Sequence, residues 1–515
     1  MSSSFPILTA IIATPFVGAL VVAVLPQRRP ELVRAVGFAA TAATIGLTGW
    51  MLWHFKSGTA GMQFVERQPW IKSLGVQYVV GVDGISVFMV ALTALLFLVG
   101  LIASGSITER LKGYMIAMLT LEAALMGVFL GLDLILFFVF FEIVLVPMYF
   151  LIAGWGHGRR QYAAVKFFLF TMAGSAFLLV GILTVAFLHQ ADHHRLTFDL
   201  AILTHWAPNG LSTSTARWLF MAFFVAFAVK VPLFPLHTWL PDAHTEAPTA
   251  GSVILAGVLL KMGTYGFLRF SLTLFPQASV DLAPLLLVLG TIGIIYGAIV
   301  AAMQPNLKRV IAYSSIAHLG FVVIGIFSLT TQGLDGGVFT MISHGLTTGA
   351  LFLLVGVLYD RRHNYDISAF RGLWRVAPVL GGLFCAAAFA SIGLPGFSGF
   401  IGEFLALLGT FLVHRPYAVI GAAGVILAAV YLLWAFQRVF MGRPDEATAA
   451  MPEINAREVL AVVPLLAVSL FLGIWPKPAL DRIQPSVNAL IQHVEHNSDY
   501  KQPDVAPRVI AGAHK

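Results

Sequence analysis

Charged residues are scarce in this sequence, and their scarcity excludes an ordinary soluble domain. Only 11% of the 515 residues are Asp, Glu, Lys or Arg, whereas soluble domains average about 25%. Hydrophobic residues make up 58% of the chain, and the mean hydropathy is +0.87. Apolar stretches long enough to span a bilayer recur along the whole length. The composition therefore predicts an all-α polytopic membrane protein in one transmembrane domain over 1–515; the alternating ten-residue segments of a β-barrel are not seen.

Cysteine is almost absent, which limits the chemistry that the chain can hold. Cys385 is the only cysteine, so no internal disulfide can form, and a thiolate-held iron–sulfur cluster would need about four. The sequence has neither a Walker A loop nor a Rossmann glycine fingerprint after a strand. We therefore expect no cofactor and no metal in this chain, and an energy source elsewhere. The net charge of +7 is typical of lysines and arginines in inner loops and does not indicate nucleic-acid binding.

The apolar stretches predict about fourteen spans. Lys and Arg gather in alternate loops, as expected when the N-terminus faces outside. Arg28 and Arg29 follow the first apolar run and no Lys or Arg precedes it, which predicts an uncleaved first helix and both termini outside. The polar stretches 55–79 and 189–216 are predicted as surface loops, and 479–515 as an amphipathic or extended tail. The expected spans are 6–26, 32–54, 80–104, 113–132, 134–153, 162–188, 217–239, 250–275, 282–303, 309–329, 335–359, 376–411, 417–441 and 457–476.

Two lysines lie within sequence that otherwise predicts membrane core. Lys230 ends the apolar run that begins at Trp218, and Lys261 lies near the centre of the next run. A charged side chain at the bilayer midplane costs roughly 2.5–3.5 kcal/mol on insertion scales. A chain that carries this cost at several positions is expected to use the residues concerned.

Prolines next to Lys230 predict a broken helix. Pro232 and Pro235 each remove an amide donor and displace the carbonyl four residues earlier, which would free the carbonyls of Ala228 and Val231. Unsatisfied backbone at membrane depth is tolerated only inside the protein or beside a hydrated cavity. The sequence therefore predicts an interrupted helix beside a buried amine, a layout found at transporter ion sites.

Four further spans have a polar centre. Glu142, His318 and His344 each lie in the middle of an apolar run, and Glu403 follows the glycine-rich segment 393–402. Pro395 in that segment would release the carbonyl of Ser391 and break a second helix. Two broken helices five spans apart suggest two inverted five-helix repeats, at about 113–275 and 282–441. Glu142 would then correspond to His318, and Lys230 to Glu403.

These buried groups predict proton transfer. Burial disfavours the charged form of amines and carboxylates alike, which lets them exchange protons near neutral pH, and an approaching opposite charge reverses the effect. A pair of Glu142 and Lys230 that forms and separates could bind and release one proton at Lys230 per cycle. Static ion pairs for the lysines and Glu142, satisfied interhelical hydrogen bonds for the histidines and a helix cap for Glu403 are the alternatives. The six candidates are Glu142, Lys230, Lys261, His318, His344 and Glu403.

Other polar residues are weaker candidates for a functional role. Glu122 and Asp133 are expected nearer a membrane face, as structural or entry groups. His237 and His244 are seven residues apart beside Asp242 and Glu246, but we favour a short helix begun by Pro241 over a metal site. For the polar run 192–195, which holds Asp192, His193 and His194, we favour a solvated turn over a metal site.

Several of these segments resemble one family of membrane proteins. The runs Leu240–Ser252 (LPDAHTEAPTAGS), Leu259–Gly266 (LLKMGTYG), Leu307–His318 (LKRVIAYSSIAH) and Ser343–Leu346 (SHGL) are similar to the signatures of antiporter-like proton-pumping subunits of respiratory complex I. The segment around Glu246, with about fourteen spans and no long lateral helix, looks like the chain M type, the counterpart of the mitochondrial fourth ND subunit. The resemblance covers roughly spans three to thirteen.

The resemblance implies roles for the six candidates. Glu142 would be the switching carboxylate and Lys230 the proton-carrying amine of an inner half-channel. Lys261 and His318 would bridge the centre, and His344 and Glu403 would form the exit half-channel. His237, Asp133 and Glu122 are kept as accessory positions.

The resemblance also implies the wider assembly. NADH oxidation and quinone reduction in other subunits, which hold flavin and iron–sulfur clusters, would drive proton transport through this chain. Its expected partners are the other membrane-arm subunits, including two antiporter-like paralogues, with phospholipids, water and protons, in a bacterial plasma membrane. A subunit of a multi-chain sodium/proton antiporter, a membrane-bound hydrogenase subunit and a structural scaffold are the competing interpretations.

Overall fold

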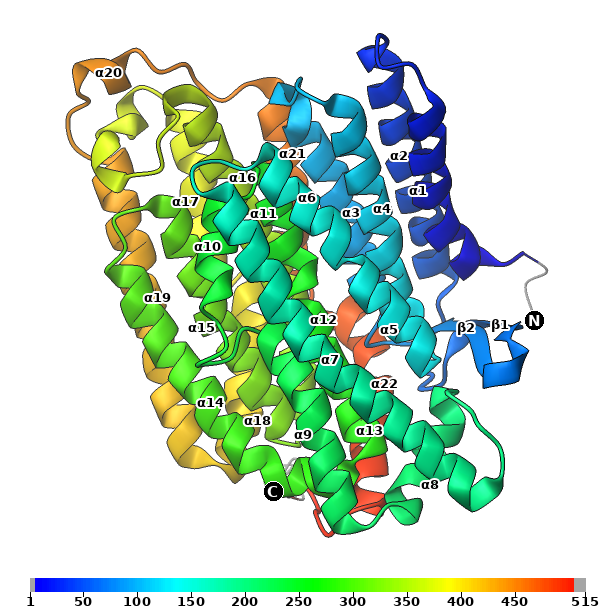
Figure 1. Ribbon diagram of the computed structural model, residues 1–515. Coiled ribbons are helices and arrows are strands. Elements are labelled where there is room, and N and C mark those ends of the chain that lie inside the picture. Colours follow the sequence, from blue (N-terminus) through cyan, green and yellow to red (C-terminus); the bar gives the residue numbers. More distant parts are fainter. Residues whose placement is uncertain (1–4, 504–515) are drawn as a thin grey trace, which may run out of the picture.

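The computed structural model describes residues 5–503, which fold mainly into helices (Figure 1). Among these described residues, twelve helices are long and apolar enough to cross a membrane, and two further apolar helices are shorter. The polytopic all-α class is therefore confirmed. The helices are α1 (Ile7–Val24), α2 (Pro30–His54), α3 (Val87–Ala103), α4 (Leu111–Leu130), α5 (Leu134–Ile143), α6 (Leu145–Trp155), α7 (Arg160–His193), α8 (Leu200–Gly210), α9 (Thr213–Lys230), α10 (Trp239–Glu246), α11 (Thr249–Ile254), α12 (Lys261–Gly266), α13 (Leu272–Leu274), α14 (Pro276–Ala302), α15 (Leu307–Phe327), α16 (Thr331–Arg362), α17 (Pro378–Ile392), α18 (Ser398–Val413), α19 (Arg415–Phe440), α20 (Glu446–Ala449), α21 (Ala456–Ile474) and α22 (Lys477–His496).

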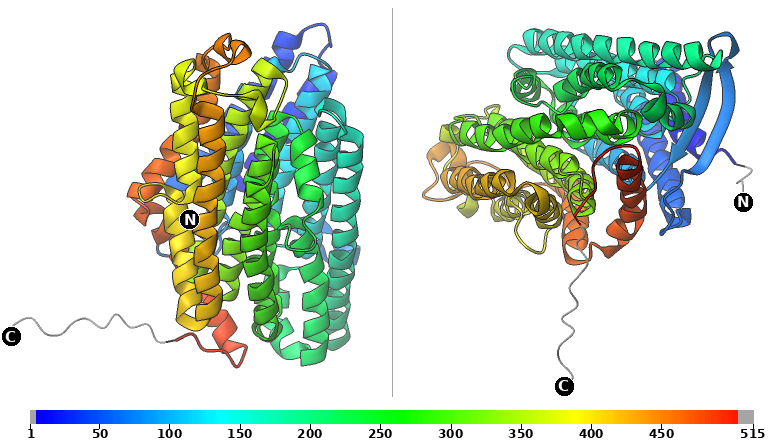
Figure 2. Two further views of the ribbon diagram at one scale, coloured as in Figure 1. Left: turned by 90° about the vertical axis from the view of Figure 1, so that its left-hand side faces the viewer. Right: turned by 90° about the horizontal axis from the view of Figure 1, so that it is seen from below.

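The long helices form one bundle in which a few are enclosed by the others (Figures 1 and 2). The continuous segment from α11 to α13 and helix α16 are buried over the whole of their most apolar stretch, and α15 is buried over 94% of it. The corresponding share is 39% for α7 and α19 and 33% for α2. Polar side chains on α12, α15 and α16 therefore face protein and not the rim of the bundle.

A hairpin replaces part of the surface loop predicted over 55–79, and that prediction was wrong. Strands β1 (Gln63–Ile71) and β2 (Val76–Val82) pair antiparallel, and Gly75 closes the turn with a φ of +66°. Valines fill most buried positions of β2, and β-branched residues favour strands. The third span consequently begins at Val87, not at residue 80.

The second predicted surface loop, 189–216, also contains regular structure. Helix α7 continues to His193, and α8 follows within the stretch expected to be irregular. The Asp199 side chain accepts a hydrogen bond from the amide of Ala201 and caps α8, as an N-cap aspartate does. Arg67 of β1 forms an ion pair with the same Asp199, which attaches the hairpin to this helix.

The tail is an amphipathic helix over the residues described. Helix α22 buries Ile483, Val487 and Val494 against the bundle, and it contacts α16 and α13. The Gly84 amide donates to Ser486 Oγ at 3.0 Å. The predicted amphipathic tail is thus present to His496, and its part from 504 to 515 lies outside the described residues.

The helix containing Lys230 breaks where the prolines predict, but its carbonyls do not stay free. Helix α9 ends at Lys230 and α10 begins at Trp239. The amide of Leu233 reaches five residues back to the Ala228 carbonyl at 2.9 Å, so the expectation of a freed Ala228 carbonyl was wrong. The indole of Trp239 donates to the Val229 carbonyl at 3.0 Å. Nearby donors thus satisfy backbone that the break releases.

The second predicted break separates α17 from α18. Helix α17 ends at Ile392, and Gly393 follows with a φ of +83°, the left-handed conformation that closes many helices. The Leu394 amide donates to the Phe389 carbonyl at 3.1 Å. Helix α18 restarts at Ser398, which places Glu403 in its second turn.

Candidate functional site

Glu142 lies at the end of α5, on a helix buried on one side only. The residue is half-buried, and its Oε1 has no hydrogen-bond partner among the described residues. Ser175 of α7 lies beside the carboxylate. Asp133 positions the helix, because its Oδ1 accepts hydrogen bonds from the amides of Ile135 and Leu136. This N-cap fixes the entry of the chain into the span.

Lys230 lies at the break between α9 and α10 and is almost fully enclosed. Its relative exposure is 1%, and Nζ has no hydrogen-bond partner in the described chain. Nζ lies 4.8 Å from the ring centroid of Phe141 and 5.9 Å from that of Phe167. Ring faces attract a cation, so both rings favour the ammonium. Within residues 5–503, no ion pair or hydrogen bond joins Glu142 and Lys230, so the two groups are separated in this structure.

Lys261 is held by the local geometry of its own helix. It begins α12, between two π-helical turns, Leu255–Leu259 and Phe267–Ser271. The Leu260 amide bonds to the Leu255 carbonyl, five residues back, and Lys261 Nζ donates to the Ala256 carbonyl at 2.6 Å. Single π turns of this kind are frequent at functional sites.

Three further titratable groups continue from Lys261 across the bundle. Lys261 Nζ lies 2.7 Å from Nδ1 of His344 on α16. The rings of His344 and His318 have centroids 5.8 Å apart, and His318 Nδ1 lies 2.6 Å from Glu403 Oε1. All four are at most 5% exposed. Groups at these separations can exchange protons directly or through one water.

Hydroxyl groups surround this line of residues. His318 Nε2 lies 3.4 Å from both Ser391 Oγ and Tyr431 OH. Ser398 Oγ lies 2.9 Å from Ser343 Oγ and 2.8 Å from Ser469 Oγ. Hydroxyls both donate and accept, so these groups can stabilise either protonation state of their neighbours. These hydroxyls could not be singled out in the sequence, because serines within apolar helices also bond to their own backbone.

The chain matches a family model described as "NADH:quinone oxidoreductase/Mrp antiporter, TM" over residues 131–430. That match covers more than half of the chain. The chain belongs to this family. All six candidate residues lie within the matched range.

Named relatives of the family are similar over most of their length. Subunit M of the NADH-quinone oxidoreductase of Rhodobacter capsulatus is 45% identical over 466 residues, which cover 89% of this chain and 90% of that one. Chain 4 of the NADH-ubiquinone oxidoreductase of Arabidopsis thaliana is 43% identical over 491 residues, 94% of this chain and 97% of that one.

Solved structures show the same fold. A chain of respiratory complex I from Thermus thermophilus with bound NADH superposes with a TM-score of 0.85 at 31% identity, over 95% of this chain and 99% of that chain. A chain of the Mrp complex from Dietzia sp. DQ12-45-1b superposes with a TM-score of 0.83 at 21% identity, over 95% and 98%. At that identity the likeness shows the fold alone.

The accessory positions of this family member lie apart from the central line. Glu122 on α4 is fully buried and its Oε2 accepts a hydrogen bond from Thr41 at 2.9 Å. Burial raises the pKa of Asp133 to about 6, although three amides donate to that side chain. His237 Nε2 lies 3.2 Å from Tyr296 OH. None of the three contacts the six candidates in the interactions described for residues 5–503.

Two buried ionisable groups outside the six candidates lie near the start of α11. Lys308 is 1% exposed and donates to the Ala247 carbonyl at 2.5 Å, and His244 is fully buried. Both are part of the motifs quoted for the family. Within the described ranges, no group of three or more His, Cys, Asp or Glu side chains is arranged to hold a metal ion.

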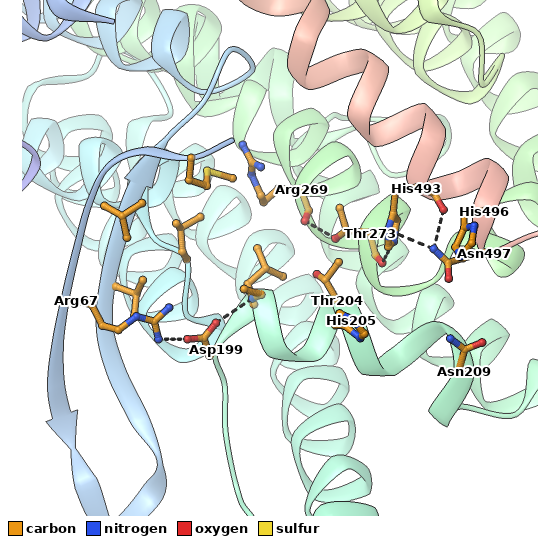
Figure 3. A pocket seen from close by; sticks show the side chains of 16 residues that line it. Arg67, Asp199, Thr204, His205, Asn209, Arg269, Thr273, His493, His496 and Asn497 are labelled. Atoms are coloured by element: carbon orange, nitrogen blue, oxygen red, sulfur yellow. Dashed lines mark hydrogen bonds and ion pairs between the residues drawn. The ribbon is translucent and has the colours of Figure 1, made fainter. Parts of the chain in front are cut away.

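A cavity of about 640 Å³ lies away from the central line (Figure 3). The hairpin, α8, α13 and α22 line it, with the Arg67–Asp199 pair at one end and His493 at the other. His493 Nε2 lies 2.8 Å from the Thr273 carbonyl oxygen. Its lining includes none of the six candidates.

Proposed function

We propose that this chain is a proton-translocating membrane-arm subunit, of the M type, in an NADH:quinone oxidoreductase. Relatives at 41–45% identity over most of the chain bear the name of subunit M or chain 4, and a complex I chain superposes over 95% of this one. The observation that carries the proposal is the buried line from Lys261 through His344 and His318 to Glu403. Ionisable residues inside a membrane protein are expensive and usually functional.

The proposed roles follow from what each group contacts. The Lys230 ammonium lies near the rings of Phe141 and Phe167 and has no hydrogen-bond partner among the described residues, so an approaching Glu142 carboxylate would strongly favour its protonated form. Separation of that pair would release the proton towards Lys261. From there His344 and His318 pass it on, and Glu403 delivers it to the exit side.

Energy for this cycle is proposed to come from other subunits. NADH oxidation and quinone reduction would occur there, at flavin and iron–sulfur clusters, with no redox chemistry in this chain. The single cysteine supports this assignment, because an iron–sulfur cluster needs more thiolates than the chain has.

The proposed topology has fourteen spans. The twelve long helices of the described chain and the two broken pairs, α9–α10 and α17–α18, together make fourteen. Segments α4–α13 and α14–α19 would form the two inverted repeats, each with one broken helix. The arginine-bearing turn between α1 and α2 lies at the same end of the bundle as α20 (Figure 1). We assign this basic-loop end to the inner side, and both termini to the periplasmic side.

The proposed surroundings follow from the family. Other membrane-arm subunits, including two antiporter-like paralogues, would flank the chain in a bacterial plasma membrane, and phospholipids would cover the remaining apolar rim. A subunit of a sodium/proton antiporter is the second candidate, because a Mrp complex chain shares the fold. Its identity of 21% is well below the 41–45% of the complex I relatives, so we favour complex I.

The test is a charge-neutral substitution at the broken helix. Lys230→Met in the assembled complex should lower NADH-driven proton uptake into vesicles by at least tenfold, because the carrier amine is gone. Lys477→Met, at an exposed lysine paired with Asp481, is the matched control and should pump normally. Unchanged uptake in an assembled Lys230→Met complex would refute the pump in favour of a static scaffold. Cosedimentation of the chain with an NADH-oxidising assembly separates complex I from a sodium/proton antiporter.

A further inference from the structure

Helix α19 carries an exposed apolar strip at the edge of the bundle (Figure 1). Only 39% of its most apolar stretch is buried inside the protein. Four large side chains on it are between 41% and 68% exposed: Ile426, Val430, Leu433 and Trp434. Because residues three and four apart are neighbours on a helix surface, these side chains form one continuous strip. This α19 strip leads towards the last turn of the helix, which ends at Phe440.

A cavity of about 540 Å³ lies where the α19 strip ends. Its walls are the last turn of α19 and the loop that precedes α17, and Trp434 belongs to both the strip and the cavity. The Gly372 amide of that loop donates to the Met441 carbonyl at 3.0 Å, which fixes the loop against the end of the helix. The polar side chains that line the cavity are Ser368, Arg371, Gln437 and Arg438.

Both arginines of the cavity have guanidinium groups that are free to bind an anion. Neither Arg371 nor Arg438 has an ion pair or a hydrogen bond among the residues that the structure describes. Arg438 lies over the ring of Trp434, with Cζ 4.6 Å from the ring centroid, and this cation–π contact uses the flat face of the guanidinium and not its N–H groups. A side chain added at Gly442 would meet Arg371 Nε at 3.4 Å, so the second guanidinium lies beside the same end of α19.

No acidic side chain neutralises this cavity. The residues that line it include neither Asp nor Glu. The nearest carboxylate to act on Arg371 is that of Asp445, but its Oδ1 accepts a hydrogen bond from the Thr448 amide at 2.7 Å and caps α20. Asp445 is exposed to solvent and lies outside the cavity lining. The cavity therefore has a net positive charge from two guanidinium groups.

A basic cavity at the end of an exposed apolar strip matches the two halves of an anionic phospholipid. Guanidinium groups bind phosphate oxygens through paired N–H donors, and basic pockets beside transmembrane helices bind anionic lipid headgroups. Tryptophans such as Trp434 are enriched at the depth of the headgroups. The Gln437 amide and the Ser368 hydroxyl can both donate and accept, which suits the hydroxyl groups of a glycerol headgroup.

We propose that this cavity binds the headgroup of an anionic phospholipid, with its phosphate between Arg371 and Arg438 and an acyl chain along the α19 strip. The lipid belongs to the leaflet at the basic-loop end, where α19 ends close to α20. The inference goes beyond the proposed function, because none of the six candidates for proton transfer lines the cavity. A neighbouring subunit could cover the strip in place of a lipid, and the experiment separates the two.

The experiment labels the α19 strip from the lipid side. The assembled complex is placed in phosphatidylcholine vesicles that contain phosphatidylglycerol with a photoreactive group on its acyl chain, and labelled peptides are identified by mass spectrometry. We expect label on α19 in the parent, and at least fivefold less in the double variant Arg371→Gln with Arg438→Gln, because basic residues near the membrane surface attract anionic lipids. Arg28→Gln, at an exposed arginine of the turn before α2, is the matched control and should keep the label. The same photoreactive lipid with a choline headgroup should label α19 of the parent at least fivefold less.

Three results would overturn the proposal. Equal labelling of α19 by both headgroups, or by the parent and the double variant, would show that the two arginines select no lipid. Absence of label on α19 in the assembled parent would show that a neighbouring subunit covers the strip. If the double variant fails to assemble, Arg371→Gln decides, since it leaves the contact of Arg438 with Trp434 in place: at least twofold loss of label supports the site, and unchanged label overturns it. Labelling is measured without NADH, so a failure of the proposed proton transport would leave this result unaffected.

Discussion

The two buried lysines differ in what surrounds their ammonium groups, and this difference suits them to different roles in the proposed function. Lys230 has rings as its neighbours and no hydrogen-bond partner in the described chain. Lys261 has a carbonyl oxygen at 2.6 Å and an imidazole nitrogen at 2.7 Å. A buried group without hydrogen-bond partners responds most to an approaching opposite charge, because no other polar neighbour competes with it. Lys230 is therefore suited to switching, and Lys261 to relaying.

His157, in the loop between α6 and α7, is expected to make the stability of the folded chain depend on pH. Burial lowers its pKa to about 4, and the charges of Lys308 and Arg160 add to the effect. An unfolded histidine titrates near 6.5. Because the folded pKa lies below the unfolded value, its contribution to stability is present above about 6.5 and is lost as the pH falls towards 4.

The melting temperature of the complex should therefore fall between pH 7.5 and pH 5, and less so in His157→Gln. Differential scanning calorimetry at several pH values measures this. His54→Gln, at an exposed histidine of α2, is the control and should leave the pH dependence unchanged. An identical pH dependence in His157→Gln and the parent would contradict the assignment.

At the scale of helices, the breaks could be predicted and their internal bonds could not. Pro232 and Pro235 place the interruption after Lys230, since proline cannot donate within a helix. The partners of the released carbonyls depend on geometry that no proline pattern contains. Leu233 reaches five residues back, and the indole that caps Val229 comes from the next helix. The π turns around Lys261 were also invisible in the sequence, because α and π turns use the same residue types.

A substitution at Trp239 tests whether the hydrogen bond from its indole stabilises the broken helix. Trp239→Phe keeps the aromatic packing against Phe167 and removes the donor to the Val229 carbonyl. A buried acceptor left without a partner costs about 1–3 kcal/mol, so the complex should melt at a lower temperature. Trp53→Phe, at a tryptophan that is 85% exposed, serves as the matched control. Equal melting temperatures for both variants would show that the indole bond contributes nothing.

At the scale of the whole chain, the scarcity of charge made the candidate residues easy to find in the sequence, and their distance in sequence hid their contacts. Six ionisable residues within apolar runs could be found because burying them is costly. Their order in space could not, since Lys261 and His344 are 83 residues apart and His318 and Glu403 are 85 apart. The hairpin was missed because the Val-rich strand Val76–Val82 precedes an apolar helix directly and its apolar run merges with the span.

The candidate residues form one continuous hydrogen-bonded path only if water molecules bridge the gaps between them. Lys230 and Lys261 have no bond to one another in residues 5–503, and His344 Nε2 has no protein partner there. Hydrogen bonds through single waters are nearly as favourable as direct ones. The central claim is therefore a hydrated line from Lys230 to Glu403.

The most direct test of that claim is a cryo-electron microscopy map of the assembled complex at about 2 Å resolution. Such a map can place the ordered waters that bridge polar groups. We predict ordered waters between Lys230 and Lys261 and at Nε2 of His344, so that Lys230, Lys261, His344, His318 and Glu403 form one unbroken chain of hydrogen bonds. A dry space between these side chains, with each held only by the protein contacts described here, would contradict the account.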